Sequence, residues 1–565
     1  MTVRKQTLIA GMIAGLCAQA VPALAQAELG AYLAGRQAAG ANDFAQGARY
    51  FGTALRADPG DPVLLESTLT SFVALGDFDK AEVIARDMVR RGLPSQIADL
   101  VVNVADAKAG NWYGIFESLE SGRSVGPLVD GLTQGWAHLG NGNIRRALAQ
   151  FDQVIETDNM TTYGVTHKAY ALASVGDFDG AEALFSARSD MQYSRKSAIA
   201  HIEILSQLGR NPQALALLDD IFGRQPDAAV AALRAALVSG QAVPFAAVPT
   251  PQAGLAEVYI TVAGLIQTDT PDTFTLLFAR AATALAPEDT PAVLMTAGLL
   301  EDLGQYDLAN AAYTGVARDD PAFASAELGR ADVLRAAGKR DAALEVLEAL
   351  ARAYPDMPRV FAAKGNLLRE AGRPEDAKAA YTGALSLYDD SAPAKWVVFY
   401  ARGIANHQLD LWPEAEADFR AALALQPGNP QVLNYLGYSL VERGEKLDEA
   451  LAMIERAVAA MPDNGAIVDS LGWVLFRLGQ YDDAVEILER ATTLEAVDPV
   501  INDHLGDAYW AVGRSIEARF QWQRALSFNP TEADAQRIRD KLDRGLDLVL
   551  IDEGKDPIRL ARGND

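Results

Sequence analysis

The sequence predicts an all-α protein built as a solenoid of paired helices. Three observations lead to this prediction: a short phrase that recurs along the chain, small residues at fixed places around it, and prolines that close the repeated units. The chain has 565 residues, of which 50% are hydrophobic and 22% charged, and this composition is globular rather than disordered. A repeat array reaches such a length without enlarging a single core.

The recurring phrase has six residues, begins with Gly and ends with Ala. It reads GDFDKA at 76–81, GDFDGA at 176–181 and GQYDDA at 479–484. The third residue of the phrase, or of its weaker copies, falls at Phe44, Phe78, Trp112, Ile144, Phe178, Asn211, Asp272, Tyr306, Arg340, Pro374, Trp412, Leu447, Tyr481 and Ser515. Most intervals between these positions are 34 residues, and one interval of 61 interrupts the series. Such spacing is produced by a repeat array.

Each unit divides into two helical patterns. In 468–491 the first pattern carries Leu471 and Leu475, and the second carries Ala484 and Leu488. Small residues recur where paired helices must approach closely: Gly35, Gly135, Gly365, Gly403, Gly437, Gly472 and Gly506 in the first helix, and Ala81, Ala147, Ala309 and Ala377 in the second. Prolines close many units: Pro59, Pro226, Pro321, Pro355, Pro427, Pro462 and Pro530. These residues resemble the tetratricopeptide repeat (TPR). The resemblance implies a right-handed superhelix of about fourteen helix pairs.

The first 25 residues predict a signal peptide. Arg4 and Lys5 precede an apolar stretch at 7–21, and small residues around Ala25 offer a cleavage site. The only cysteine, Cys17, follows Leu16, whereas lipoprotein processing requires a small residue there. We therefore expect an exported, periplasmic chain from which Cys17 is removed, without a disulfide or a lipid anchor.

The mature chain divides into five predicted segments. They are an N-terminal TPR array (26–226), an irregular insertion (227–254), a C-terminal TPR array (255–531), a charged capping helix (532–551) and a flexible tail (552–565). The insertion contains three prolines between 238 and 254. It is either a tolerated insertion or a functional segment, namely a hinge or a docking loop, and we favour the tolerated insertion.

Charge and composition exclude several functions. The net charge of −25 opposes binding to nucleic acid or to an anionic membrane surface. The five histidines fall in different repeats without metal-ligand spacing: His138, His167, His201, His407 and His504. No catalytic motif appears, so we expect no enzyme, no cofactor and no metal.

Asp503 and Asp507 are four residues apart on one helix. They form either a cation site or, as we favour, a solvated or ligand-facing pair.

In TPR arrays the first helix of each pair lines the concave side, where partner segments bind. Aligning the last units by their glycines gives ladders of equivalent residues, and we expect nine of them to face a protein partner: Tyr400, Asn434, Tyr438, Asp469, Trp473, Phe476, Asp503, Asp507 and Trp510. Aromatic side chains with a few polar neighbours are typical of binding hot spots. The alternative is that these aromatics pack against adjacent repeats or the terminal helix.

Residues 434–491, together with GLAEVYITVAGLI at 254–266, resemble a group of long proteobacterial cell-envelope TPR proteins. One member type is a lipoprotein adaptor for a periplasmic carboxyl-terminal processing protease. This resemblance implies a non-enzymatic adaptor that links such a protease to its substrates. The alternative is a structural component of a polysaccharide-export or pilus-secretion assembly. A hydrolase with its site between repeats has no catalytic residues to support it.

Overall fold

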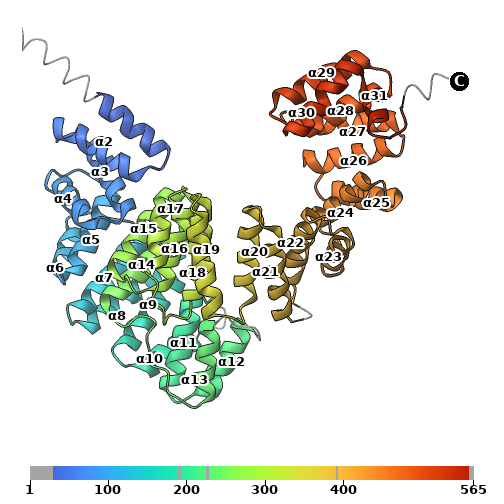
Figure 1. The fold of residues 1–565 in the computed structure, drawn as a ribbon. Helices are drawn as coiled ribbons and strands as arrows, with labels where there is room; N and C mark the ends of the chain where they lie inside the picture. The colour runs from blue at the N-terminus through green and yellow to red at the C-terminus, as the bar shows by residue number, and fades with distance from the viewer. Residues whose placement is uncertain (1–28, 188–192, 224–227, 390–391, 559–565) are drawn as a thin grey trace, which may run out of the picture. The chain divides into compact units, whose positions relative to one another are not determined.

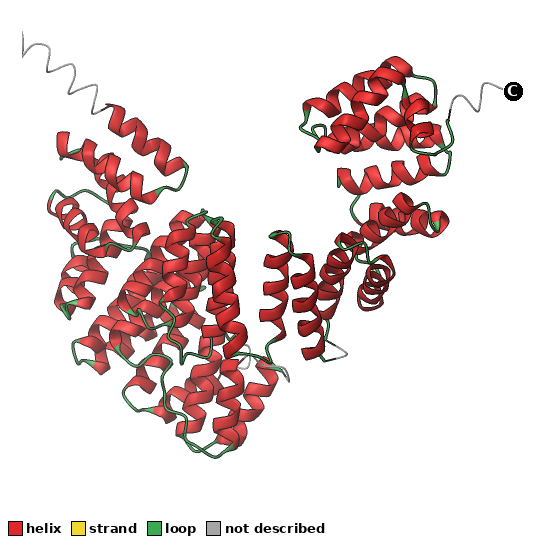
Figure 2. Cartoon of the chain, in the orientation of Figure 1, coloured by secondary structure: helices red, strands yellow, loops and turns green. Residues whose placement is uncertain are grey.

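The computed structural model describes residues 29–187, 193–223, 228–389 and 392–558. The predicted signal peptide lies outside these residues, as do the last seven residues of the predicted tail. The chain forms two compact units, Met1–Leu350 and Ala351–Asp565, which we call the first and the second unit (Figure 1). All regular secondary structure in the described part is helical (Figure 2).

The predicted repeat register is confirmed, because all fourteen phrase positions are the first residue of a helix. These second helices of the pairs are α2 (Phe44–Ala57), α4 (Phe78–Arg90), α6 (Trp112–Glu120), α8 (Ile144–Glu156), α10 (Phe178–Ser186), α12 (Asn211–Phe222), α15 (Asp272–Leu285), α17 (Tyr306–Thr314), α19 (Arg340–Ala353), α21 (Pro374–Leu387), α23 (Trp412–Leu425), α25 (Leu447–Ala460), α27 (Tyr481–Leu494) and α29 (Ser515–Ser527). The phrase is a helix stop followed by a helix start. At 76–81, Gly76 adopts φ +80° and ends one helix, and the Asp77 carboxylate caps the next.

The first helices of the pairs are α3 (Pro62–Leu75), α5 (Gln96–Lys108), α7 (Pro127–Gly140), α9 (Thr161–Ser174), α11 (Arg195–Gln207), α14 (Pro251–Ile266), α16 (Thr290–Asp302), α18 (Phe323–Ala336), α20 (Pro358–Glu370), α22 (Lys395–Gln408), α24 (Pro430–Arg443), α26 (Gly465–Arg477) and α28 (Pro499–Ala511). Residues 29–40 are also helical. The glycines of these helices have no side chain, so the second helix of the pair can pack closely against them. A Cβ at Gly472 would lie 2.5 Å from Leu488, closer than carbon atoms approach.

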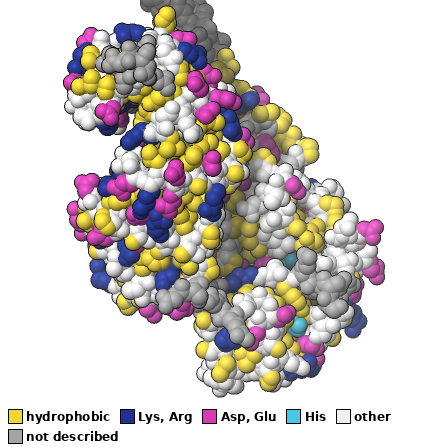
Figure 3. Space-filling model, turned by 90° about the vertical axis from the view of Figure 1, so that its right-hand side faces the viewer, with side chains coloured by type: hydrophobic (Ala, Val, Ile, Leu, Met, Phe, Trp, Pro, Cys, Tyr) yellow, Lys and Arg dark blue, Asp and Glu magenta, His cyan; other side chains and the backbone are white. Residues whose placement is uncertain are grey.

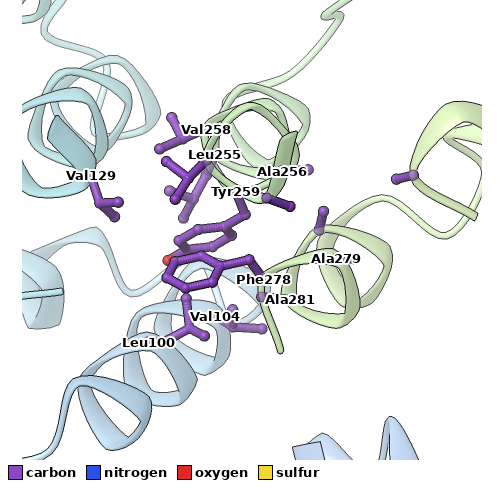
Figure 4. Packing of buried hydrophobic residues seen from close by; sticks show 14 of the residues in the cluster. Leu100, Val104, Val129, Leu255, Ala256, Val258, Tyr259, Phe278, Ala279 and Ala281 are labelled. Carbon is purple, nitrogen blue, oxygen red and sulfur yellow. The ribbon is translucent and has the colours of Figure 1, made fainter. Parts of the chain in front are cut away.

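Successive first helices contact one another within each unit, as α3 and α5, α7 and α9, and α24, α26 and α28 do. They therefore line the inner side of the superhelix. In the first unit this side is occupied by the chain itself, because α14 packs on α7 and α9 while α15 packs on α3 and α5. Figure 4 shows Tyr259 of α14 and Phe278 of α15 beside Leu100 and Val104 of α5.

The predicted irregular stretch 227–254 differs from the structure in its first part. Residues Ala228–Val238 form helix α13, which packs on α12 and begins a pair that has no second helix. The loop that follows is held in place, because Glu203 accepts hydrogen bonds from the N–H groups of Ala246 and Ala247 at 3.0 and 3.1 Å. The two compact units also divide at residues 350 and 351 rather than at this stretch. The packing of α14 and α15 on earlier repeats explains why.

The predicted capping helix 532–551 is two helices, α30 (Glu532–Arg544) and α31 (Leu546–Asp552). Gly545 separates them with φ +83°, and a Cβ there would lie 2.6 Å from the ring of Trp510. The apolar core of the second unit includes Ile538 of α30 and Leu546 of α31, so both helices are integral to it. The predicted tail continues into described structure, where the N–H of Ile558 donates to Asp547 at 2.6 Å.

The surface carries interspersed acidic and basic side chains with hydrophobic ones between them, on the face shown in Figure 3. Within the described ranges, every helix is too short or too polar to cross a bilayer. The excess of acidic residues is therefore carried by a mixed surface rather than by one block of a single sign on that face.

Candidate functional site

The inner side of the second unit holds a pocket of about 440 Å³. One wall comes from the first helices α24, α26 and α28, and the other comes from α30 and the residues after α31. Its lining includes the aromatic rings of Tyr438, Trp473 and His504 and both acidic and basic side chains. The acidic ones include Glu442, Asp503 and Asp534, and the basic ones are Arg477, Arg537 and Lys555. The pocket thus lies on the predicted ladders, and its far wall comes from the predicted cap.

Trp473 and Phe476 are buried, with 8% and 7% of their surface exposed. The Trp473 ring is stacked on Phe476 at a centroid distance of 4.8 Å and on His504 at 4.0 Å. Its indole N–H donates to Glu442 Oε1 at 2.5 Å. For these two aromatics the structure therefore favours the alternative of packing within the chain, and only part of Trp473 borders the pocket.

His504 forms the floor of the pocket between Trp473 and Asp469. Its Nδ1 lies 3.0 Å from Asp469 Oδ2, and both side chains are buried. Burial opposes protonation of His504, but the Asp469 carboxylate outweighs it, with help from Asp503 and Asp507. The pKa of His504 is therefore raised above its ordinary value.

Asp503 and Asp507 are ion-paired with a lysine of this chain. Lys541 of α30 is fully buried, and its Nζ lies 2.8 Å from Asp503 Oδ2 and 2.7 Å from Asp507 Oδ1. Arg537 adds a second positive charge at 3.6 Å from each carboxylate. The expectation of a solvated or partner-facing pair is wrong for Asp507, because the terminal helix covers it. Burial raises the pKa of Asp503, and Lys541 opposes that shift.

Trp510 and Trp522 are also held by the chain. The Trp510 indole N–H donates to Asp547 Oδ2 of α31 at 2.8 Å. The Trp522 indole N–H donates to Asp507 Oδ1 at 2.9 Å, and the two indole rings pack at a centroid distance of 5.7 Å. The carboxy-terminal end of the ladder is therefore closed by α30 and α31.

Tyr400, Asn434 and Tyr438 are half-buried. Tyr400 packs on Phe419 and Tyr435, with ring centroids 6.0 and 5.9 Å away, so it belongs to an aromatic cluster outside the pocket. Tyr438 lines the pocket. Of the nine predicted residues, the pocket brings together Tyr438, Trp473 and Asp503.

The sequence prediction missed the basic residues that pair with Asp503 and Asp507, although the 34-residue spacing of the repeats would have located them. Lys541 lies 34 residues after Asp507, and Arg537 lies 34 residues after Asp503. Both therefore continue the ladders into α30, which stacks as one more first helix. The sequence predicted a charged terminal cap, and the basic ladder positions of that cap face the preceding acidic ones.

The first unit has buried polar contacts of a different kind. Lys196 of α11 is held at 2.9 Å from Glu257 of α14, which packs against the earlier repeats, and at 2.5 Å from Asp289, which directly precedes α16. The Trp136 indole N–H donates to His167 Nδ1 at 3.0 Å, and both side chains are buried. Burial, together with Lys196, lowers the pKa of His167 to about 3. These contacts join the unit's own helices.

Comparison with known proteins agrees with this architecture. Two family models described as tetratricopeptide repeat match, one over residues 300–367 and 444–503, and the other over 132–194 and 362–430. The chain is a tetratricopeptide-repeat protein. Repeats of this kind are typically non-catalytic and are typical of proteins that bind other proteins. Within the described residues, no group of three His, Cys, Asp or Glu side chains could hold a metal ion.

The relatives match this TPR protein over short stretches. TPR repeat-containing protein PA4667 of Pseudomonas aeruginosa is 34% identical over 110 residues, which are 20% of this chain and 18% of the relative. Bacteriophage adsorption protein A of Escherichia coli is 35% identical over 80 residues, which are 14% of this chain and 8% of the relative. Among solved structures, the anaphase-promoting-complex assembly Cut9–Hcn1 gives a TM-score of 0.39 at 16% identity, over 93% of this chain and 98% of that one.

Proposed function

We propose that this protein is a non-enzymatic scaffold that binds a segment of another protein in the pocket of the second unit. The observation that carries the proposal is the pocket itself. It opens on the inner side of a TPR array, and aromatic, aliphatic and charged side chains line it together. Binding surfaces commonly combine these residue types, with aromatic groups as anchors.

The rigidity of the pocket supports the same function. Trp473 is fixed by two stacked rings and a hydrogen bond, and the opposite wall is fixed by the ion pairs of Lys541. A wall that is already ordered loses little conformational entropy when a partner binds. In the first unit the inner side is filled by α14 and α15, so we assign partner binding to the second unit.

We further propose that the chain is exported and acts in the periplasm as an adaptor that brings a processing protease to envelope proteins. The basic and apolar residues of 1–25 support export, and the resemblance of residues 434–491 to envelope TPR adaptors supports the partner. A structural role in a polysaccharide-export or pilus-secretion assembly is the competing assignment. The identity of the captured partner decides between them.

The test is crosslinking and affinity capture from envelope extract with the wild-type chain and with Tyr438→Ala. Tyr113→Ala is the matched control, because Tyr113 is 67% exposed on a helix of the first unit. We expect a processing protease among the proteins that wild type and control capture and that Tyr438→Ala loses. Capture of export proteins alone would contradict the adaptor role. Capture that is identical for all three chains would contradict the pocket as the binding site.

A further inference from the structure

The charges that border the pocket are arranged in two groups. In the part formed by the chain's terminal residues, the basic groups are already paired. Arg537 Nε lies 2.7 Å from Glu553 Oε1, and Lys555 Nζ lies 2.9 Å from Glu553 Oε2. This part of the lining is therefore close to neutral and satisfied by the chain.

The part around Tyr438 has an acidic excess. Glu442 and Asp534 line the pocket there, and Arg477 is the basic lining residue on the same side. Glu442 uses Oε1 for the Trp473 indole, and a carboxylate offers about four acceptor positions, so Oε2 can accept from a ligand. Burial raises the pKa of Tyr438, and so do the charges of Glu442, Asp469 and Asp534, while Arg477 opposes the shift.

Further along the same ladder, the chain itself shows which side chain binds between two carboxylates and an aromatic ring. Two repeats later, the chain's own Lys541 enters between Asp503 and Asp507, with its ammonium 5.8 Å from the centroid of the Trp522 ring. Two carboxylates and an aromatic ring thus hold a lysine in the closed part of the ladder. Around Tyr438 two carboxylates and an aromatic ring border open space instead.

We propose that the pocket selects a partner segment by one basic side chain, Lys or Arg, whose charged end binds Glu442 and Asp534 and whose aliphatic stem lies along Tyr438. The inference rests on the proposed function and adds the chemistry of the partner to it. A neutral or acidic side chain at this place would leave the carboxylates desolvated without a counter-charge, which costs affinity.

The test uses random decapeptides displayed on phage and selected on the purified full-length chain. The best peptide is then synthesised, and its affinity is measured by fluorescence anisotropy for the wild type, for Glu442→Gln/Asp534→Asn and for Glu455→Gln/Asp482→Asn. The last variant is the matched control, since it removes two exposed acids from second helices. Thermal unfolding checks that all three chains remain folded.

We expect the selected peptides to share a Lys or Arg at one position. The affinity of the best peptide should fall about tenfold in Glu442→Gln/Asp534→Asn, which equals about 1.4 kcal/mol, and stay within about twofold in the control. Norleucine in place of the basic residue should weaken binding to wild type but not further weaken binding to that variant. Selected peptides without a basic residue, equal affinity for all chains, or no enrichment would overturn the inference. Partner capture that still depends on Tyr438 would then leave the proposed function standing.

Discussion

The two units use the inner side of the superhelix in opposite ways. In the first unit, α14 and α15 return to earlier repeats and fill the space between α3, α5, α7 and α9. In the second unit, α30 closes the inner side at α28 through the Lys541 ion pairs, and a pocket borders α24, α26 and α28. One repeat type therefore gives a filled body in the first unit and a pocket in the second, and the difference comes from which helices follow in the chain.

The largest loss of stability is expected from a cavity in the core of the first unit, where α14 packs on α7. Trp136 of α7 is fully buried against Gly254 of α14, where a Cβ would lie 2.2 Å from the indole. Trp136→Ala should destabilise the first unit by about 5 kcal/mol, because it leaves a cavity and removes the donor to His167. Hydrogen exchange should show faster opening of α7 and α14, with the second unit unchanged. Equal loss in both units would contradict separate cores.

Lys541→Met should lower the free energy of unfolding of the second unit at the end covered by α30. This change leaves Asp503 and Asp507 buried without their ammonium partner, at a cost of about 4 kcal/mol in the free energy of unfolding. Urea unfolding of the full chain, read out through the exchange of α28 and α30, measures the loss. The triple variant with Asp503→Asn and Asp507→Asn should recover most of it. Failure of the triple variant to recover would show that Lys541 acts by packing rather than by charge.

Acidification should weaken the first unit through His167. Its folded pKa of about 3 lies below the ordinary value near 6.5, so between these pH values the unfolded chain binds a proton that the folded chain does not. Between pH 7 and pH 5 this group should remove about 2 kcal/mol of stability. The protection of α7 and α9 against hydrogen exchange, corrected for the intrinsic pH dependence of amide exchange, measures the loss at both pH values, with His167→Gln as the reference. The same pH dependence in that variant would contradict the assignment.

His504 should make the second unit less stable as the pH rises, which is the opposite of the effect of His167 in the first unit. Asp469 raises its pKa despite burial, so the stabilisation is complete below the unfolded value near 6.5 and is lost as pH rises through the folded value. The protection of α26 and α28 against exchange, corrected for the intrinsic rise of amide exchange with pH, should therefore fall on going from mildly acidic to alkaline pH. His504→Gln should abolish that response. A second unit that becomes more stable as pH rises in the wild type alone would contradict the Asp469–His504 pair.

The sequence predicted the repeats because their signal is local. A glycine at positive φ, a capping residue and a small residue under the partner helix recur in many of the repeats, and each acts within its own helix pair. The start of all fourteen second helices therefore followed from spacing alone. Helix α13 was missed because three nearby prolines and an incomplete pair obscure it.

The candidate site could be predicted only in part, because its completion depends on long-range packing. The ladders placed Tyr438, Trp473 and Asp503 together, as the pocket does. Whether a ladder residue stays open depends on what packs on it from the next repeat, as His504 does on Trp473 and Lys541 on Asp507. The return of α14 and α15 onto earlier repeats left no local signal in the 34-residue pattern.

The most direct test of the account places a photo-crosslinking benzoylphenylalanine at one inner position of each unit in cells. The positions are Tyr438 in the open pocket and Ile97, which borders Phe274 and Leu277 of α15 in the filled unit. The account predicts adducts with another protein from position 438 and only internal crosslinks from position 97. Adducts with other proteins from position 97, or none from position 438, would contradict it.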